Sequence, residues 1–81
     1  MQKITIYSTP SCPYCVMVKK YLEEKNIPFK EVDVSVDTKA AVSMQEKSGQ
    51  MGVPVVIIEK DKNENIIVGF DKGKIDKILN I

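Results

Sequence analysis

The residues of this sequence that could do chemistry are two cysteines, Cys12 and Cys15, in the segment Cys12-Pro13-Tyr14-Cys15. Two thiols at this spacing can exchange with a disulfide, because one thiolate attacks a disulfide sulfur and the second thiol then resolves the mixed disulfide. The chain contains no histidine, which excludes Cys–His and Ser–His–Asp catalysis and removes the commonest metal ligand. The functional prediction therefore rests on the thiols.

Two other uses of the cysteine pair have to be weighed. A purely structural disulfide between Cys12 and Cys15 would close a very short loop and restrain little of the unfolded chain. A structural zinc site takes about four ligands, which this chain could supply only as a dimer sharing two cysteines from each copy. A redox-active pair agrees best with the elements around it, and no metal is expected.

These elements are a strand and then a helix. Residues 3–9 alternate and are rich in Ile, Thr and Tyr, which predicts a strand, and the following Pro10 breaks it. Over residues 12–25 the apolar spacing favours an amphipathic helix with Pro13 in its first turn. The residues assigned to its inner face are Cys15, Val18, Leu22 and Lys25, with Met17 and Tyr21 beside them.

This placement gives the two thiols different roles. At a helix start several backbone N–H groups are unpaired and the helix dipole is positive, so a thiolate at Cys12 is stabilised. Cys12 is the expected attacking thiol. Cys15 lies deeper in the helix, so we expect it to be more buried, less ionised, and the resolving thiol.

The rest of the chain predicts a second strand at residues 29–34 and a second helix capped by Asp37 or Thr38 and ended by Gly49. The β-branched run 55–58 predicts a strand buried on both faces, followed by a polar turn at 60–65 and a short antiparallel partner at 66–68. A last helix over about 71–80 has an apolar face of Ile75, Ile78 and Leu79. The order βαβ-ββα predicts a single α/β domain, 1–81, with a four-stranded mixed sheet flanked by three helices.

Two loops could join the cysteines in a site. Gly52-Val53-Pro54 precedes the buried strand; a cis proline facing Cys12 would leave the Val53 backbone free to pair with a substrate, whereas a proline can also simply mark a strand start. Gly69-Phe70-Asp71 precedes the last helix. Asp71 can serve there as a helix N-cap, or the backbone N–H groups can receive a substrate carboxylate, and the sequence leaves both open.

Composition limits the partners. The 81 residues are 43% hydrophobic and 28% charged, and 12 basic against 11 acidic residues give a net charge of +1. A net charge this close to zero gives no electrostatic basis for binding to nucleic acid or to an anionic membrane. No apolar run is long enough to span a bilayer, and the first residues do not match a secretory signal. A cytoplasmic protein is the resulting expectation.

The motifs Cys-Pro-Tyr-Cys after a strand, Val-Pro before a buried strand and Gly-Phe-Asp before the last helix resemble those of glutaredoxins. The resemblance implies a thioredoxin fold with a cis Val53–Pro54 bond. It also implies reduction of protein disulfides and of glutathione mixed disulfides. Glutathione would be the co-substrate, and glutathione reductase would return the oxidised glutathione to its reduced form. A monomer is expected.

Carried over residue by residue, the resemblance makes Cys12 the nucleophile and Cys15 the resolver. Tyr14 would flank glutathione, Val53 would pair with its cysteinyl backbone, and Phe70 and Asp71 would meet its γ-glutamyl end. The full expected substrate-binding set is Thr9, Pro13, Tyr14, Val53, Pro54, Gly69, Phe70 and Asp71.

Two positions depart from the pattern. Thr9 stands where many glutaredoxins have a lysine for the glycine carboxylate, and Val68 stands where they have the first of two glycines. Lys19, Lys39 or backbone amides could meet that carboxylate instead.

Three alternatives remain open. Some glutaredoxin-like redoxins with a Gly-Phe segment are reduced by thioredoxin reductase and donate electrons to ribonucleotide reductase or other disulfide targets. Two chains could instead share an iron–sulfur cluster through Cys12. A non-catalytic domain could use the Val53–Pro54 loop to hold peptides.

Overall fold

Seven elements follow one another in the computed structural model, which describes residues 2–50, 52–60 and 62–79. They are β1 (Gln2–Ser8), α1 (Pro13–Glu24), β2 (Lys30–Asp33), α2 (Thr38–Ser48), β3 (Val55–Lys60), β4 (Asn63–Val68) and α3 (Lys72–Leu79).

The four strands form one mixed sheet in the order β2-β1-β3-β4. β1 and β2 run parallel, with Ser8 opposite Asp33, and α1 makes the crossover between them. β3 pairs antiparallel with both β1 and β4. The predicted βαβ-ββα order and mixed sheet are therefore confirmed, and this arrangement is the thioredoxin fold.

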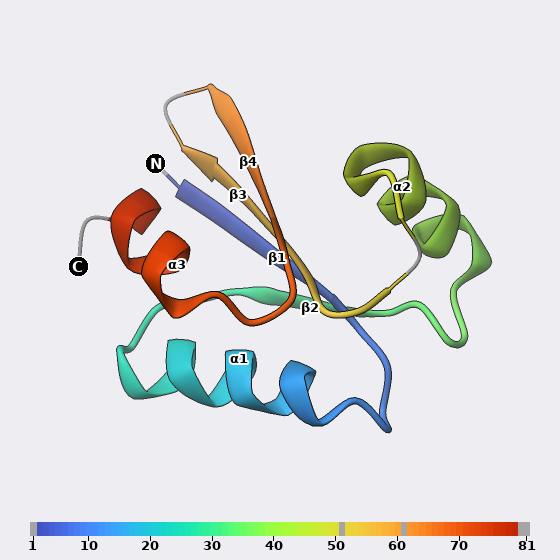
Figure 1. Cartoon of the computed structure of the whole chain (residues 1–81), viewed down its shortest axis with the longest axis horizontal. Coiled ribbons are helices and arrows are strands. Elements are labelled where there is room, and N and C mark those ends of the chain that lie inside the picture. Colours follow the sequence, from blue (N-terminus) through green and yellow to red (C-terminus); the bar gives the residue numbers. More distant parts are fainter. Residues whose placement is uncertain (1, 51, 61, 80–81) are drawn as a thin grey trace.

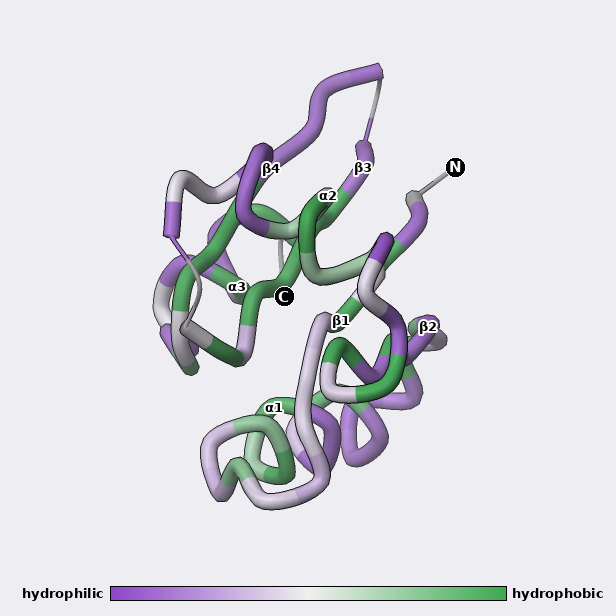
Figure 2. The backbone as a smooth tube through the Cα atoms, turned by 90° about the vertical axis from the view of Figure 1, so that its right-hand side faces the viewer, coloured by the Kyte–Doolittle hydropathy of each residue, from purple (hydrophilic) through white to green (hydrophobic). Residues whose placement is uncertain are grey.

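The helices cover the two faces of the sheet unequally. α1 and α3 lie on one face and α2 lies on the other (Figure 1). The continuous run 55–58 of β3 is buried throughout, as expected for a central strand with helices on both sides. Figure 2 shows that the middle parts of the strands are hydrophobic and that the tip of the β3–β4 hairpin is hydrophilic. The start of β3 and the end of β4 lie at the opposite end from that tip.

The helix ends follow the sequence signals. Cys12 is the N-cap of α1 and Pro13 is its first residue, where a missing N–H costs no hydrogen bond. The Asp37 side chain caps α2 by accepting from the Ala40 N–H at 3.0 Å. Gly49 ends α2 in the left-handed conformation, with φ of +74°.

The predicted hairpin needs one correction. Residues 60–65 are not a polar turn: Lys60 ends β3 and Asn63 begins β4, and the two are paired in the ladder. Polar side chains at this tip resemble a loop in composition, but they are strand residues whose side chains face solvent. The turn is correspondingly short, and Lys62 lies within it with φ of +69°.

Two residues predicted on or beside the inner face of α1, Lys25 and Met17, are exposed instead. Its buried residues are Cys15, Val18 and Leu22, whereas Met17 is 45% exposed and Lys25 is the exposed C-cap residue. Lys25 lies beyond the last helical residue, so the helical period no longer places it over the sheet. α3 starts one residue later than predicted, and Asn80 lies outside the described residues. No helix in the described part of the chain is long and apolar enough to cross a membrane.

Candidate active site

Cys12 lies at the N-terminus of α1, where its sulfur meets backbone groups from two parts of the chain. The Cys15 N–H donates to Cys12 Sγ at 3.2 Å, so the sulfur occupies the N-cap position. The Cys12 thiol also donates to the Val53 carbonyl at 3.8 Å. The N–H donor from the helix is arranged to stabilise a thiolate. Cys12 is partly exposed and is therefore accessible to a disulfide.

Cys15 differs from Cys12 in its exposure to solvent. It is a free thiol with no exposed surface. Burial raises its pKa to about 11, and its hydrogen bond with Cys12 adds to the rise. The expectation that Cys15 is more buried than Cys12 is confirmed, and the raised pKa of Cys15 agrees with the expectation that it is the less ionised thiol.

The Val53–Pro54 bond is cis, as the resemblance implied. Pro54 is fully buried, Val53 is partly buried, and the Val53 carbonyl faces the Cys12 thiol. The Pro54 carbonyl accepts from the Gly69 N–H at 2.8 Å. Cys12, the cis-proline loop and Gly69 are thus joined by hydrogen bonds into one end of the molecule.

The segment after β4 turns toward α1. Gly69 has φ of +81°, a conformation that glycine adopts without strain. The Phe70 ring packs against the core and lies 5.9 Å from the Tyr21 ring of α1, tilted by 56°. The Asp71 carboxylate accepts from the Lys74 N–H at 3.1 Å, so Asp71 is the N-cap of α3. That carboxylate is therefore already used within its own helix.

The surface beside Cys12 is apolar. Tyr14 is 59% exposed, and Val16 and Met17 of the same helix end are each close to half exposed. Pro13 is also exposed. Large apolar side chains exposed together around a nucleophile are typical of a surface that contacts another molecule.

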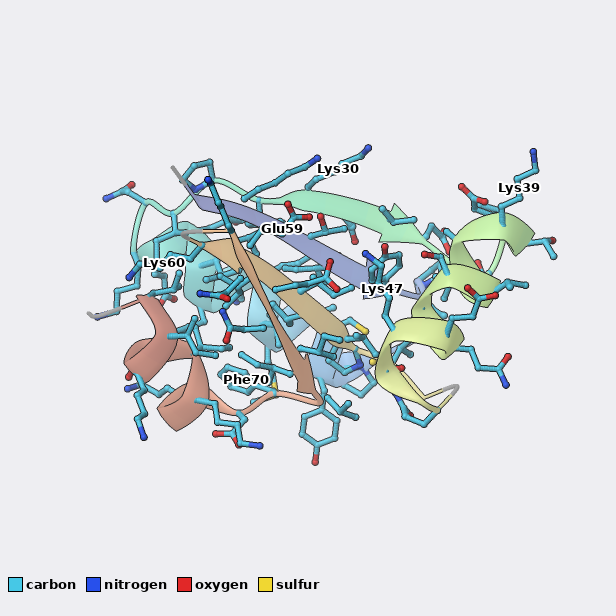
Figure 3. All side chains as sticks on the ribbon, turned by 90° about the horizontal axis from the view of Figure 1, so that it is seen from above. Lys30, Lys39, Lys47, Glu59, Lys60 and Phe70 are labelled. Atoms are coloured by element: carbon cyan, nitrogen blue, oxygen red, sulfur yellow. The ribbon has the colours of Figure 1, made fainter. Side chains whose placement is uncertain are left out.

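The cations named for a substrate carboxylate are differently placed. Lys19 is engaged in an ion pair with Glu31 of β2 at 2.5 Å. Lys39 is exposed on α2 and points away from the sheet (Figure 3). Thr9 accepts the Cys12 N–H through its carbonyl at 3.3 Å, so the backbone of Thr9 is part of the site.

Sequence reasoning missed two polar networks attached to α1. In the first, Glu31 accepts from Ser8 at 3.0 Å as well as from Lys19. In the second, the Tyr21 hydroxyl donates to Asp76 of α3. A lysine four residues after Cys15 was a usable signal, but its partners lie on other elements and leave no local pattern.

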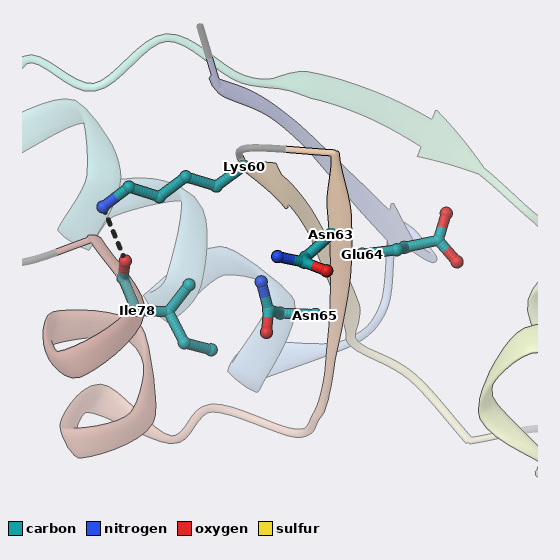
Figure 4. A pocket seen from close by; sticks show the side chains of 5 residues that line it. All are labelled: Lys60, Asn63, Glu64, Asn65 and Ile78. Atoms are coloured by element: carbon teal, nitrogen blue, oxygen red, sulfur yellow. Dashed lines mark hydrogen bonds between the residues drawn. The ribbon is translucent and has the colours of Figure 1, made fainter.

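A hollow of about 470 Å³ lies at the other end of the molecule. It is lined by the tip of the β3–β4 hairpin and the end of α3 (Figure 4), namely Lys60, Asn63, Glu64, Asn65 and Ile78. Lys60 donates there to the Ile78 carbonyl at 3.1 Å, which satisfies an open carbonyl at a helix C-terminus. Because the cysteines lie beside the opposite ends of these strands, this hollow is not part of the thiol site.

Fold and site together define a thioredoxin-fold protein with an accessible thiol at a helix start and a buried second thiol one turn later. In the part of the chain that the structure describes, no group of three or more His, Cys, Asp or Glu side chains could hold a metal ion.

Comparison with known proteins agrees with this class. The family model of glutaredoxin matches residues 4–62. A glutaredoxin-like 8.6 kDa protein in the rubredoxin operon of Clostridium pasteurianum is 50% identical over 76 residues, covering 94% of this chain and 96% of that protein. The glutaredoxin of Neisseria meningitidis serogroup A is 34% identical over 88 residues, with 99% of both chains covered.

Among solved structures, the glutaredoxin-like protein NrdH-redoxin from Escherichia coli superposes with a TM-score of 0.79 at 28% identity, covering 94% of this chain and 93% of that one. The chain belongs to the glutaredoxin family.

Proposed function

We propose that this protein is a dithiol oxidoreductase that reduces protein disulfides and glutathione mixed disulfides, with glutathione as the reductant. The observation that carries the proposal is the arrangement of Cys12, partly exposed at the start of α1 and hydrogen-bonded by the Cys15 N–H. Membership of the glutaredoxin family supports it.

In the first step, the Cys12 thiolate attacks one sulfur of a substrate disulfide. A bond forms between Cys12 Sγ and that sulfur, the substrate S–S bond breaks, and the departing thiolate takes up a proton from solvent. An extended substrate backbone can pair with Val53, whose cis peptide bond and partly buried side chain present its backbone beside Cys12.

In the second step, Cys15 attacks Cys12 Sγ, the Cys12–Cys15 disulfide forms, and the second substrate thiol is released. Two molecules of glutathione then reduce this disulfide and are oxidised to glutathione disulfide, which returns the protein to its dithiol form. For a glutathione mixed disulfide, free glutathione can take the place of Cys15, so the second cysteine is not required.

A second candidate differs only in the reductant. The solved NrdH-redoxin is described as having a thioredoxin-like activity profile, and Thr9 and Val68 stand where many glutaredoxins carry glutathione-contacting residues. These features favour electron supply by thioredoxin reductase, with ribonucleotide reductase or another disulfide protein as the acceptor.

The thiol roles are tested with a matched pair of variants, Cys12→Ser and Cys15→Ser. Cys12→Ser should abolish all turnover, because serine is not a nucleophile toward disulfides. Cys15→Ser should retain reduction of a glutathionylated peptide and lose most reduction of a protein disulfide. Equal turnover of the two variants with both substrates would refute the proposed roles.

The reductant is tested with the unaltered protein by following NADPH consumption. Both assays contain a glutathionylated peptide as the disulfide substrate; one also contains glutathione and glutathione reductase, and the other contains thioredoxin reductase alone. Turnover in the first assay supports the glutathione-dependent function. Turnover only in the second replaces it with the thioredoxin-reductase alternative and withdraws Phe70 and Asp71 as glutathione contacts.

A further inference from the structure

The buried Cys15 thiol presents a difficulty for the second step of the proposed mechanism. This step needs the Cys15 thiolate, but burial and the hydrogen bond with Cys12 raise the pKa of Cys15 to about 11. Once Cys12 is held in a mixed disulfide, it is neither a thiolate nor a thiol, so its contributions to this pKa are lost. The influences that then favour the Cys15 thiolate against burial are the Thr9 backbone and the charge of Lys19.

Lys19 is placed to act on Cys15. It follows Cys15 by four residues on α1, so the two side chains share one face of the helix, and helical side chains lean toward the N-terminus. Cys15 in turn contributes to the raised pKa of Lys19, although the main cause is the hydrogen bond to Glu31. Lys19 therefore stays protonated throughout the reaction.

Glu31 fixes where this ammonium group lies. Its Oε2 atom accepts from Lys19 Nζ at 2.5 Å and from Ser8 Oγ at 3.0 Å. Ser8 ends β1 with 2% of its surface exposed, and Glu31 belongs to the neighbouring strand β2. Two strands thus hold the lysine, and the same carboxylate offsets part of its charge.

Other charges around the pair come from the same elements. Glu23 of α1 acts on Lys19, and Asp33 of β2 acts on Glu31. The ionisable groups that act on Cys15 itself are Cys12 and Lys19.

We propose that Lys19 and Glu31 form a charge pair that controls the resolving step, in which Lys19 promotes and Glu31 restrains ionisation of the buried Cys15 thiol. The inference rests on the proposed dithiol function. Lys19 and Glu31 are positioning residues, because neither exchanges a proton or an electron with the substrate.

In the Cys12 mixed disulfide, the Cys15 thiol gives its proton to solvent. Its thiolate attacks Cys12 Sγ, so that the Cys12–Cys15 bond forms and the bond from Cys12 to the substrate sulfur breaks. The substrate thiolate leaves with the electron pair and takes a proton from solvent.

The test is a stopped-flow reaction of the reduced protein with an excess of uncharged dipyridyl disulfide, which releases a coloured thiopyridone at each exchange. Cys12 should release the first equivalent in a fast phase, and Cys15 should release the second in a slower phase. The quantity compared is the rate of the second phase divided by that of the first, measured across neutral pH.

The two charge variants should move this ratio in opposite directions. In Lys19→Met the ratio should fall about threefold at neutral pH, because the positive charge that favours the Cys15 thiolate is removed. In Glu31→Gln the ratio should rise about threefold, because the lysine charge is no longer offset. Lys19→Arg should restore the ratio, and Lys20→Met removes a lysine from the same helix as a control for net charge.

If Lys19→Met and Glu31→Gln only loosened the structure, the ratio of the two rates would change in the same direction in both variants. Opposite changes in the ratio therefore separate a charge effect from a packing effect. Shifts of the same sign, or no shift, would overturn the inference. If Cys15→Ser retained the second phase, or the unaltered protein lacked it, the proposed dithiol mechanism itself would fail.

Discussion

The two faces of the sheet differ in how firmly they hold the residues of the site. Under α1 and α3, nine buried apolar side chains form one cluster, whereas under α2 the described residues contribute three, Met44, Val55 and Ile57. Val18 and Leu22 of the thiol-bearing helix belong to the large cluster. Val53 of the cis-proline loop packs against the small one.

The two apolar clusters therefore support different parts of the site. The α1/α3 face holds the thiols and Phe70, and the α2 face supports the backbone at Val53 that a substrate would meet. Damage to the first face should therefore slow thiol exchange, and damage to the second should weaken substrate binding.

The largest expected effect comes from removing one buried side chain on each face, Leu22→Ala and Met44→Ala, both 1% exposed in the native protein. Leu22→Ala should lower the free energy of unfolding by about 3 to 4 kcal/mol, and Met44→Ala by about 2 to 3 kcal/mol. The cost at Met44 is smaller because α2 buries only this side chain and can settle toward the sheet. Chemical denaturation measures both values.

The same two variants test the division of work. Leu22→Ala should slow the reaction of Cys12 with a disulfide, and Met44→Ala should raise KM for a glutathionylated peptide while leaving the maximal rate. A slower maximal rate in Met44→Ala than in Leu22→Ala would break the comparison.

A smaller effect is expected from a matched pair of glycines. Gly69 and Gly49 both have positive φ, and an added Cβ at either meets nothing within 4 Å. Alanine should therefore cost about 1 kcal/mol at each, from backbone strain alone. Thermal or chemical unfolding should give similar losses for Gly69→Ala and Gly49→Ala.

Of these two glycines only Gly69 belongs to the site, because its N–H donates to the Pro54 carbonyl. KM for a glutathionylated peptide should rise in Gly69→Ala and stay at the native value in Gly49→Ala. An equal rise in both would mean that KM follows general stability rather than the geometry of this loop.

Local signals in the sequence were sufficient for the helix starts and the central strand. Pro13 after Cys12 marks the start of α1, and Asp37 and Gly49 mark the two ends of α2, because caps and prolines act within one turn. The uniformly β-branched run 55–58 predicted a strand buried on both faces for a similar local reason.

The polar strand ends and the ion networks could not be predicted in the same way. Asn63 and Glu64 read as a turn because their strand character comes from pairing with β3, which composition does not reveal. Ser8, Lys19 and Glu31 come from three elements, and their contact follows from the parallel pairing of β1 with β2 beneath α1.

The smallest effect concerns the polar contact between α1 and α3. Asp76 of α3 accepts from Lys72 at 2.8 Å and from the Tyr21 hydroxyl. The hydrogen bond from Lys72, and then that from Tyr21, hold the pKa of Asp76 below its usual value of 3.8. A carboxylate with a lowered folded-state pKa contributes stability above its unfolded pKa and loses it as the pH falls through the folded value.

Asp76→Asn should therefore be less stable than the native protein at neutral pH, and this difference should shrink as the pH falls below about 4. Unfolding curves from pH 7 down to pH 2.5 measure it. The control is Glu64→Gln, which breaks the exposed ion pair with Lys47 of α2 and should cost less at neutral pH. If Asp76→Asn and Glu64→Gln lost equal stability, the polar contacts on the α1/α3 face would be no stronger than the ion pair on the α2 face. The greater stability of the α1/α3 face would then come from its buried apolar side chains alone.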